Sequence, residues 1–331
     1  MDKLLTIIIA TYNRKEGLLR QLHSIYNQKE SSEVEIVICD NHSDYDVDLA
    51  IREEFSQEIA SNLEVITNEQ NLGMGANLAL MLLKSKTPWF WTLSDDDVTH
   101  PNSIRNILKT INDHPDVGFI KFSMVGKYPN DDSVVESLEG LCDFYYKSKH
   151  IPGELIFISN NVYNKSIIDK YYGLTLGYSY CLIPQLLPAF FALEKHDIKV
   201  LLSSESVVEA MQNGGWNILK GTIGMSVIST MPFALSYKNR KKLVAVTMGN
   251  CNHIRILCEA LEWPDRRQGK FMYEMLYKSC FRLINRIYDP VLNVMFHVCY
   301  HLRINPKLLI GLYPKVQNNK VLGKLLTKQF G

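Results

Sequence analysis

The chain has 331 residues, of which 46% are hydrophobic and 21% are charged, and its formal net charge at pH 7 is +1. This composition is typical of a folded globular protein and excludes a low-complexity or intrinsically disordered chain. There is no uninterrupted run of the roughly 18 apolar residues that a membrane-spanning helix needs, and the first ten residues lack the basic start and long apolar core of a signal peptide.

Cysteine spacing and charge distribution bear on location and partners. The seven cysteines form no C-x-x-C pair, which favours free thiols in a cytoplasmic protein over a disulfide or zinc framework. Residues 278–331 contain nine Lys or Arg and one acidic residue, whereas residues 1–277 contain 27 basic and 34 acidic residues. The chain is therefore acidic in front and basic behind.

The first 125 residues alternate between strand-like and helix-like segments. Apolar runs rich in β-branched residues predict strands at 4–10, 34–39, 63–67, 89–93 and 117–124. Helical periodicity predicts helices at 13–25, 47–58, 74–84 and 101–111. Asn13 is the expected N-cap of the first helix, with Glu16 at the capping-box position. The alternation predicts an α/β fold with a mostly parallel sheet covered on both faces.

The pattern becomes less regular after about residue 125. Residues 127–149 are polar and predict a mobile loop or a short hairpin. Further strands are expected at 154–162 and 198–202, and further helices at 166–172 and 182–195. The pattern is mostly helical from about residue 243, and the sequence predicts an α/β domain over residues 1–245 and a mostly helical, basic region over residues 246–331.

Polar residues follow the predicted strands at their carboxyl ends. They are Thr11, Tyr12 and Asn13 after the first strand, Asp40 after the second, 68–73 after the third, and Asp95, Asp96 and Asp97 after the fourth. Ligands of open parallel sheets bind outside these ends, so the residues are expected to form one site.

The three consecutive carboxylates are the most specific part of this site. Adjacent anions repel one another and are rarely buried without a partner. A divalent cation such as Mg²⁺ or Mn²⁺ would neutralise them through oxygen ligands. The alternative is a solvated acidic turn.

Four segments in this order resemble the family 2 glycosyltransferases of GT-A fold. The segments are 7–14 (IIIATYNR), 37–43 (VICDNHS), 71–77 (NLGMGAN) and 93–97 (LSDDD). The SDDD form is most similar to O-antigen sugar transferases, including abequosyltransferase-like proteins. The resemblance implies a Rossmann-like sheet with a helical C-terminal extension. It also implies transfer of a sugar from a nucleotide-sugar donor to a saccharide acceptor in bacterial surface polysaccharide synthesis (O-antigen, lipopolysaccharide or capsule).

The same resemblance assigns roles to individual residues. Those expected to bind the nucleotide are Thr11, Tyr12, Asn13, Arg14, Asp40, Asn71, Gly73 and Asp95. Asp96 would be the principal, catalytic ligand of Mn²⁺ or Mg²⁺, and Asp97 would assist directly or through water. Such an ion stabilises the departing nucleoside diphosphate as a Lewis acid. Plain structural roles are the alternatives: a capped helix start, a capping aspartate, and a glycine turn.

The sequence departs from the family where a general base is expected. Most inverting members carry a Glu-Asp pair on the helix before the last core strand, and that place falls near Pro184 and Gln185, which are not acids. Glu194 is the nearest substitute, although a surface acid is the simpler interpretation. Inversion and retention therefore both stay open.

Two weaker assignments complete the predicted site. Ser159, Asn160 and Asn161 carry uncharged hydrogen-bonding groups that suit sugar or acceptor hydroxyls, or simply end a strand. His253 could complete a metal site from the C-terminal region, or have a structural role.

The basic residues of 278–331 alternate with apolar ones, which favours an anionic membrane surface. We expect a peripheral protein on the inner face of the cell membrane, with a lipid-linked acceptor. A helical cap with a solvated basic face is the alternative. Nucleic acid is not an expected partner, because no binding motif is present and the first part of the chain is acidic.

Two other functions fit parts of the sequence. A sugar-phosphate nucleotidyltransferase would show a glycine-rich loop after the first strand, which residues 10–14 lack. A non-catalytic scaffold of a polysaccharide-assembly complex would explain the missing Glu-Asp pair, but not the retained Asp95, Asp96 and Asp97. The donor sugar, its nucleotide and the acceptor are not predicted by any motif.

Overall fold

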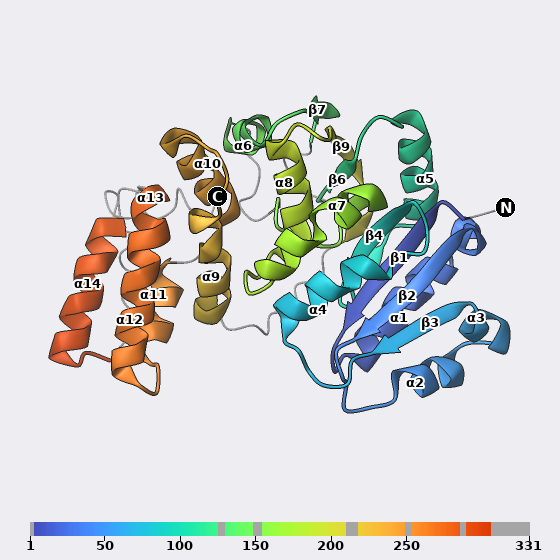
Figure 1. Cartoon of the computed structure of the whole chain (residues 1–331). Coiled ribbons are helices and arrows are strands. Elements are labelled where there is room, and N and C mark those ends of the chain that lie inside the picture. Colours follow the sequence, from blue (N-terminus) through green and yellow to red (C-terminus); the bar gives the residue numbers. More distant parts are fainter. Residues whose placement is uncertain are drawn as a thin grey trace, which may run out of the picture. The chain divides into compact units, whose positions relative to one another are not determined.

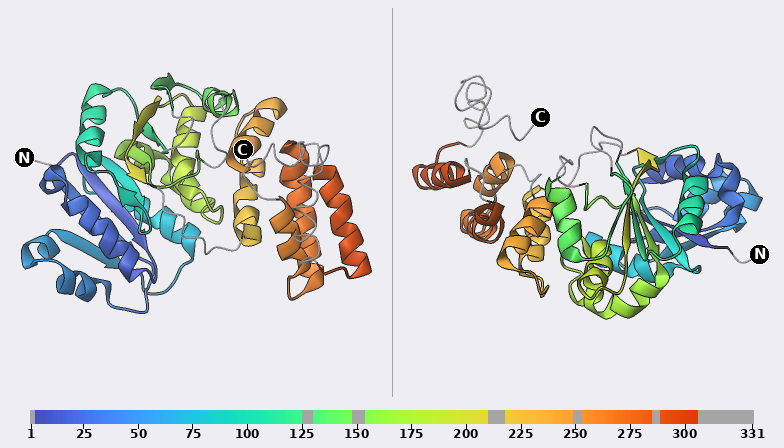
Figure 2. Two further views of the ribbon diagram at one scale, coloured as in Figure 1. Left: turned by 180° about the vertical axis from the view of Figure 1, so that it is seen from behind. Right: turned by 90° about the horizontal axis from the view of Figure 1, so that it is seen from above.

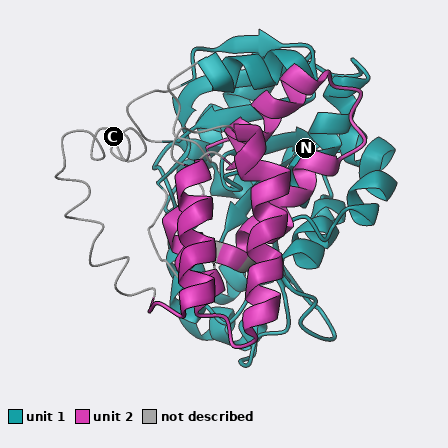
Figure 3. Cartoon of the chain, turned by 90° about the vertical axis from the view of Figure 1, so that its left-hand side faces the viewer, with its two compact units in different colours: residues 1–150, 156–214 teal, residues 151–155, 215–331 magenta. Residues whose placement is uncertain are grey.

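The computed structural model describes residues 3–124, 130–147, 154–209, 218–248, 253–284 and 289–305 (Figure 1). The chain divides into two compact units, drawn in teal and magenta in Figure 3. Unit 1 comprises residues 1–150 and 156–214, and unit 2 comprises residues 151–155 and 215–331. Residues 215–245, expected from the sequence in the α/β domain, thus group with the helical unit.

Unit 1 is built on an eight-stranded sheet of order β3-β2-β1-β4-β8-β6-β9-β7. The strands are β1 (Leu5–Thr11), β2 (Val34–Asp40), β3 (Leu63–Thr67), β4 (Trp89–Ser94), β6 (Phe119–Ser123), β7 (Ser133–Val135), β8 (Asn161–Asn164) and β9 (Val200–Ser206). Strands β1–β4 pair in parallel, as do β6 and β9, whereas β8 and β7 pair antiparallel with their neighbours. The predicted α/β class with a mostly parallel sheet is confirmed.

Helices cover both faces of this sheet (Figures 1 and 2). The helices of unit 1 are α1 (Lys15–Tyr26), α2 (Val47–Glu54), α3 (Gln57–Ser61), α4 (Met74–Met81), α5 (Ser103–Asp113), α6 (Leu138–Lys147), α7 (Lys165–Gly177) and α8 (Leu187–Glu194). Helices α1 and α5 lie on one face, and α4, α7 and α8 lie on the other. Two short strands, β5 (Val98–Thr99) and β10 (Val208–Glu209), pair separately.

Alternation along β1 explains why both faces are covered. Ile7 and Ile9 pack in one apolar cluster with Leu22 of α1 and Ile107 of α5. Ile8, between them, is also fully buried and faces the opposite layer. A strand that is buried on both faces reads as a continuous apolar run, which is why its limits were predicted to within one residue.

The irregular middle of the chain was predicted least well. The expected loop or hairpin at 127–149 contains β7 and helix α6 in its described part, and the strand expected at 154–162 is instead β8, at Asn161–Asn164. The helix expected at 47–58 is interrupted after Glu54: Phe55 has an extended backbone, and the Ser56 hydroxyl accepts the Ile59 amide at the start of α3.

The described residues of unit 2 form helices joined by short loops, with no strand among them. Its helices are α9 (Ile218–Ser226), α10 (Tyr237–Met248), α11 (His253–Leu261), α12 (Arg266–Leu276), α13 (Arg282–Ile284) and α14 (Asp289–Leu302), with short turns η4 (Val227–Thr230) and η5 (Tyr277–Phe281). Its core includes Tyr273 stacked on Phe296 at 3.8 Å between ring centroids. Among the described helices of both units, none has the length and apolar character to cross a membrane.

Candidate functional site

The carboxyl ends of β1, β2 and β4 meet at one edge of the sheet. Thr11 pairs with Asp40, and Ala10 pairs with Ser94. The Asn41 amide donates to the Thr11 carbonyl at 3.0 Å, and the Asn68 amide donates to the Asp40 carbonyl at 2.9 Å. The convergence that parallel topology predicted is therefore present.

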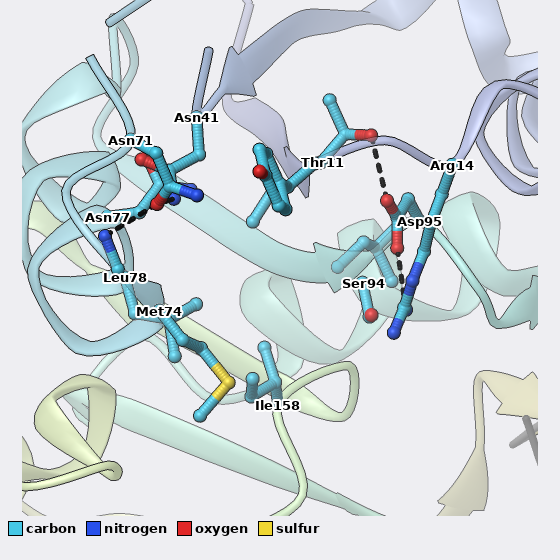
Figure 4. A pocket seen from close by; sticks show the side chains of 14 residues that line it. Thr11, Arg14, Asn41, Asn71, Met74, Asn77, Leu78, Ser94, Asp95 and Ile158 are labelled. Carbon is cyan, nitrogen blue, oxygen red and sulfur yellow. Dashed lines mark hydrogen bonds and ion pairs between the residues drawn. The ribbon is translucent and has the colours of Figure 1, made fainter. Parts of the chain in front are cut away.

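A pocket of ≈ 380 Å³ opens beside these strand ends (Figure 4). Its lining residues are Ala10, Thr11, Tyr12, Arg14, Asn41, Asn71, Gly73, Met74, Asn77, Leu78, Leu93, Ser94, Asp95 and Ile158. Figure 4 shows asparagines at one end, Arg14 with Asp95 at the other, and Met74 with Ile158 between them. Six of the eight residues expected to bind a nucleotide line this pocket; Asn13 and Asp40 do not.

Asn13 and Asp40 hold the neighbouring loops together. Asn13 has a left-handed backbone (φ 53°), and its side chain donates to Asp44 Oδ2 at 2.8 Å and accepts the Asp44 amide at 2.7 Å. Asp40 is buried and accepts the amide and the hydroxyl of Ser43 at 3.0 and 2.6 Å. Because Arg14 precedes the helix without a side-chain cap bond, the capping box expected for Asn13 is wrong.

Arg14 is the counter-ion of the first two carboxylates. Its Nη1 donates to Asp95 Oδ1 at 3.1 Å and to Asp96 Oδ2 at 2.6 Å. Burial opposes the charge on Arg14, but the two carboxylates together raise the pKa of its guanidinium. Burial raises the pKa of Asp95, against the opposing effects of the Thr11 hydrogen bond at 2.7 Å and of Arg14.

The three carboxylates have different environments. Asp95 and Asp97 are buried, and Asp97 accepts the Ser159 hydroxyl at 2.5 Å. The Asp96 side chain is 19% exposed and accepts the Ser94 hydroxyl at 2.5 Å. A solvated acidic turn is therefore excluded, and Asp96 is the carboxylate that remains partly open to a ligand.

Whether these residues fit a divalent cation depends on Arg14. Within the described residues, no group of three or more His, Cys, Asp or Glu side chains is arranged around a common metal position. The guanidinium of Arg14 pairs with Asp95 and with Asp96 Oδ2, an oxygen that a cation bound by Asp96 would need. Carboxylate oxygens suit Mg²⁺ or Mn²⁺, which complete their shell with water and phosphate. The residues thus fit an ion provided that Arg14 turns away.

A cluster of asparagines, of which the sequence assigned a role only to Asn71, shapes the opposite end of the pocket. Asn41 donates to Asn71 Oδ1 at 2.9 Å, and its own Oδ1 accepts from Asn68 at 3.1 Å and from the Leu72 amide at 3.0 Å. Asn68 also donates to Asn77 Oδ1 at 2.9 Å. The available sequence signal was an asparagine directly after a strand end, as at Asn41. The structure shows that this residue is buried.

Two glycines set the shape of the site. Gly73 has a φ of 77°, the left-handed region that favours glycine, which agrees with the alternative of a glycine turn, while its expected contact with the nucleotide stays a prediction. A Cβ on Gly17 of α1 would lie 2.8 Å from the Asp95 carbonyl oxygen. The sequence assigned no role to Gly17. Its lack of a side chain lets α1 approach the backbone of the turn formed by Asp95, Asp96 and Asp97, called here the carboxylate turn.

Ser159, Asn160 and Asn161 are fully buried, and their side chains bond inside the protein. Lys121 Nζ of β6 donates to Asn160 Oδ1 at 2.5 Å and to Asn161 Oδ1 at 2.8 Å. The Ser159 hydroxyl bonds to Asp97 and also accepts the Ser94 amide at 2.9 Å. This arrangement supports the carboxylate turn from behind and does not favour the expected contact with sugar.

The structure does not support Glu194 as a general base. Glu194 ends α8 and lies 3.7 Å from Lys195 Nζ, just before β9 begins at Val200. Because β9 runs in the same direction as β4, its start lies at the edge opposite Asp95. Gln185 lies near the place where most inverting members of the family carry their Glu-Asp pair. It is buried, and its Oε1 has no hydrogen-bond partner among the described residues.

His253 belongs to unit 2 and is buried there. Its Nδ1 lies 2.7 Å from Asp289 Oδ1, and its Nε2 lies 2.8 Å from the Tyr273 hydroxyl. With both ring nitrogens engaged, this arrangement favours the structural role over the metal-binding one.

Comparisons with known proteins agree with this geometry. The model of the family described as glycosyl transferase family 2 matches residues 6–171, half of the chain. An uncharacterized glycosyltransferase of Haemophilus influenzae is 32% identical over 117 residues, which are 35% of this chain and 37% of that protein. The match therefore spans little more than a third of the relative's length.

Solved structures of S. aureus TarS 1-349, alone and in complex with UDP-GlcNAc, resemble the chain with TM-scores of 0.59 and 0.60. Each is 15% identical and covers 93% of this chain and 92% of its own. At this identity the likeness shows the fold alone. With its mostly parallel sheet, flanking helices and helical C-terminal region, the chain belongs to glycosyl transferase family 2 and has the GT-A fold.

Proposed function

We propose that the chain transfers a sugar from a nucleotide-sugar donor, bound in the pocket of Figure 4, to a saccharide acceptor. The observation that carries the proposal is the pocket itself, which places Arg14 and Asp95 at one end and amides at the other. Its volume of ≈ 380 Å³ lies in the usual range of small-ligand sites. The TarS neighbour was solved with UDP-GlcNAc, which agrees with such a donor.

The lining residues suit the parts of a nucleoside diphosphate. Tyr12 is 41% exposed and offers an aromatic face for stacking on a base. Asn71 and Asn77 offer amide groups to base or ribose, and Arg14 can bond phosphate oxygens with two N–H groups. Arg14 and Asp95 therefore mark the diphosphate end of the pocket.

The residues around the carboxylates can stabilise the negative charge that develops on the leaving diphosphate. A divalent ion, Mn²⁺ or Mg²⁺, when bound by Asp96 with help from Asp97, would supply a Lewis acid for the leaving diphosphate. Ser94 and Ser159 hold Asp96 and Asp97 in place. Once Arg14 leaves the carboxylates, its charge is available to phosphate oxygens.

The attacking group is the acceptor hydroxyl. Its oxygen forms the new bond to the anomeric carbon, the bond to the diphosphate oxygen breaks, and the hydroxyl proton must leave. Gln185 cannot take that proton, because an amide is not a base at neutral pH. The general base of an inverting route is therefore unassigned, whereas a retaining route needs no carboxylate at this place, so the stereochemical outcome stays open.

We extend the proposal to a bacterial surface polysaccharide, O-antigen, lipopolysaccharide or capsule, with a lipid-linked acceptor on the inner face of the cell membrane. The abequosyltransferase-like SDDD segment and the excess of Lys and Arg in residues 278–331 support it. Most of that basic segment lies outside the described residues.

The test is a screen of UDP-, GDP-, dTDP- and CDP-sugars for slow donor hydrolysis with Mn²⁺ or Mg²⁺. Asp96→Ala should abolish hydrolysis, while Asp113→Ala, an exposed acid paired with Lys109, should retain it. Wild-type turnover in Asp96→Ala, or in excess chelator, would contradict the metal role.

A non-catalytic scaffold is the second candidate, because Gln185 replaces the expected carboxylate. Thermal shift separates the two functions, since only a donor-binding enzyme gains stability from nucleotide with Mn²⁺. Family membership argues against a sugar-phosphate nucleotidyltransferase.

A further inference from the structure

Helix α14 (Asp289–Leu302) presents an apolar row to solvent. Leu292, Phe296 and Cys299 are buried on its inner side. The outer face of α14 consists of side chains that are between 36% and 69% exposed: Val291, Val294, Met295, Val298 and Leu302. Their spacing of three, four, seven and eleven residues from the first aligns them along one side of the helix.

This outer face contains no charge. No Asp, Glu, Lys or Arg occurs between Asp289 and Arg303. Isolated exposed apolar residues are normal, but a contiguous row on one helix marks a contact surface. Valine is also a weaker helix former than the charged residues usual on a solvated face, so helix formation does not explain the row.

Positive charge gathers at the C-terminal end of the same helix. Arg266 of α12 donates to the Tyr300 carbonyl at 2.6 Å, and its guanidinium lies 5.0 Å from the Tyr300 ring centroid. Lys270 Nζ lies 5.2 Å from that centroid, and Arg303 is exposed. Three acids lie near these cations in the sequence: Glu262, Asp265, whose carboxylate caps α12, and Glu274, which lies 3.7 Å from Lys270 Nζ.

The sequence that follows adds charge of one sign. Residues 304–331 contain five lysines and no acidic residue. This segment begins at the end of α14 that carries Arg303 and neighbours Arg266. An uncharged apolar row next to a concentration of cations fits the interface of an anionic bilayer, where apolar side chains enter the acyl boundary and cations remain among headgroups.

We propose that the outer face of α14, together with Arg266, Lys270 and Arg303 at its C-terminal end, is a membrane-contact surface for anionic phospholipid. The inference deepens the proposed function, because it locates on unit 2 the contact that a lipid-linked acceptor requires. Lipid is favoured over a second copy of the chain, since another copy carries the same excess of positive charge at this helix end.

The test uses the full chain and co-sedimentation with vesicles of phosphatidylglycerol and phosphatidylethanolamine, against vesicles of phosphatidylcholine. Val294→Asp with Val298→Asp should lower partitioning to anionic vesicles by about tenfold or more. Leu174→Asp on α7, 45% exposed, is the matched control and should partition like wild type. Binding should also weaken with added salt.

Three results would overturn the inference: no binding of wild type to anionic vesicles, equal binding of the double variant and wild type, or a wild-type dimer that Val294→Asp converts to a monomer. Circular dichroism must show that the variants are folded. Donor hydrolysis without vesicles is measured in parallel. Its failure with intact vesicle binding would count against the proposed function and leave the membrane contact standing.

Discussion

Arg14 and Asp96 form an ion pair of 2.6 Å between Nη1 and Oδ2, and the same nitrogen also reaches Asp95 at 3.1 Å. Arg14 thus pairs with Asp95, which is expected to bind nucleotide, and with Asp96, which is expected to be the principal ligand of a divalent cation. Because Arg14 holds Asp96 Oδ2, an ion that binds to this oxygen must displace the Arg14–Asp96 ion pair. The Arg14 side chain is 47% exposed and has room to turn toward a ligand.

The first prediction concerns this competition. Arg14→Ala should raise the affinity for Mn²⁺ in the absence of nucleotide, and should lower the affinity for a nucleoside diphosphate. A half-exposed pair contributes only about 1 kcal/mol, so a change of roughly fivefold is expected. Electron paramagnetic resonance of free Mn²⁺ measures the first effect and calorimetry the second.

Two further variants sharpen that experiment. Arg14→Lys keeps the charge and should keep most of the competition, although a point charge pairs less well with two carboxylates. Arg105→Ala removes an exposed arginine paired with Glu30 at 2.7 Å and should leave Mn²⁺ affinity unchanged. An unchanged Mn²⁺ affinity in Arg14→Ala would mean that the ion does not bind at these oxygens.

The second prediction concerns the glycine behind Asp95. In Gly17→Ala, the new Cβ would lie 2.8 Å from the Asp95 carbonyl oxygen, so helix or turn must shift. The affinity for nucleotide should fall, because the shift displaces Asp95. The stability of the fold should not gain the roughly 1 kcal/mol that a Gly→Ala change in a helix can contribute. Gly173→Ala in α7, where nothing lies within 4 Å of the added atom, is the matched control. Equal nucleotide affinity in both variants would contradict the packing argument.

The third prediction concerns the buried lysine of β6. Lys121→Met removes the donor shared by Asn160, Asn161 and the Phe157 carbonyl, leaving three buried acceptors without it. An orphaned acceptor costs about 1–3 kcal/mol, so the thermal midpoint should fall by roughly 5 °C or more. Lys109→Met, at an exposed ion pair on α5, should shift it little. A midpoint equal to that of wild type would show that the network can rearrange without cost.

Particular residues show what the sequence could predict. The limits of β1, β2 and β4 follow from apolar runs that end in polar residues, and parallel topology then brings Thr11, Asp40 and Asp95 to one edge. The parallel arrangement of these strands and the edge at which the pocket lies were predictable, because they depend on local pattern and on one rule of topology.

Side-chain pairing was not accessible in the same way. Lys121 lies inside an apolar strand. It is tolerated there because acceptors far away in the sequence, the Phe157 carbonyl and the side chains of Asn160 and Asn161, take its hydrogen bonds. Asn13 has the residue type of an N-cap but a left-handed backbone, because Ser43 and Asp44 bond to it across the loop. Arg14 was expected to contact nucleotide, and its pairing with Asp95 and Asp96 depends on a side-chain rotamer that no sequence motif encodes.

The last prediction takes its sign from Asp95. Burial, the largest cause, raises its pKa in the folded protein above the ordinary value of 3.8, so folding disfavours its charged form. The ionised carboxylate therefore lowers stability at neutral pH, and this cost disappears as pH falls through the folded pKa toward the unfolded one. Asp95→Asn should raise the thermal midpoint at pH 7–8, with a gain that shrinks toward pH 4, while nucleotide affinity is lost.

Asp197 provides a control of opposite sign for the same pH series. Hydrogen bonds from Lys170 and Tyr171 lower its pKa, so its ionised form stabilises the fold above the unfolded pKa, and this contribution is lost as pH falls. Asp197→Asn should therefore lower the midpoint at pH 7–8 and have less effect near pH 4. Differential scanning fluorimetry of both variants from pH 4 to 8 measures the two trends. If Asp95→Asn lowered the midpoint at neutral pH, the ion pair with Arg14 would outweigh burial, and the carboxylate turn would owe its stability to the charge that a divalent ion must displace.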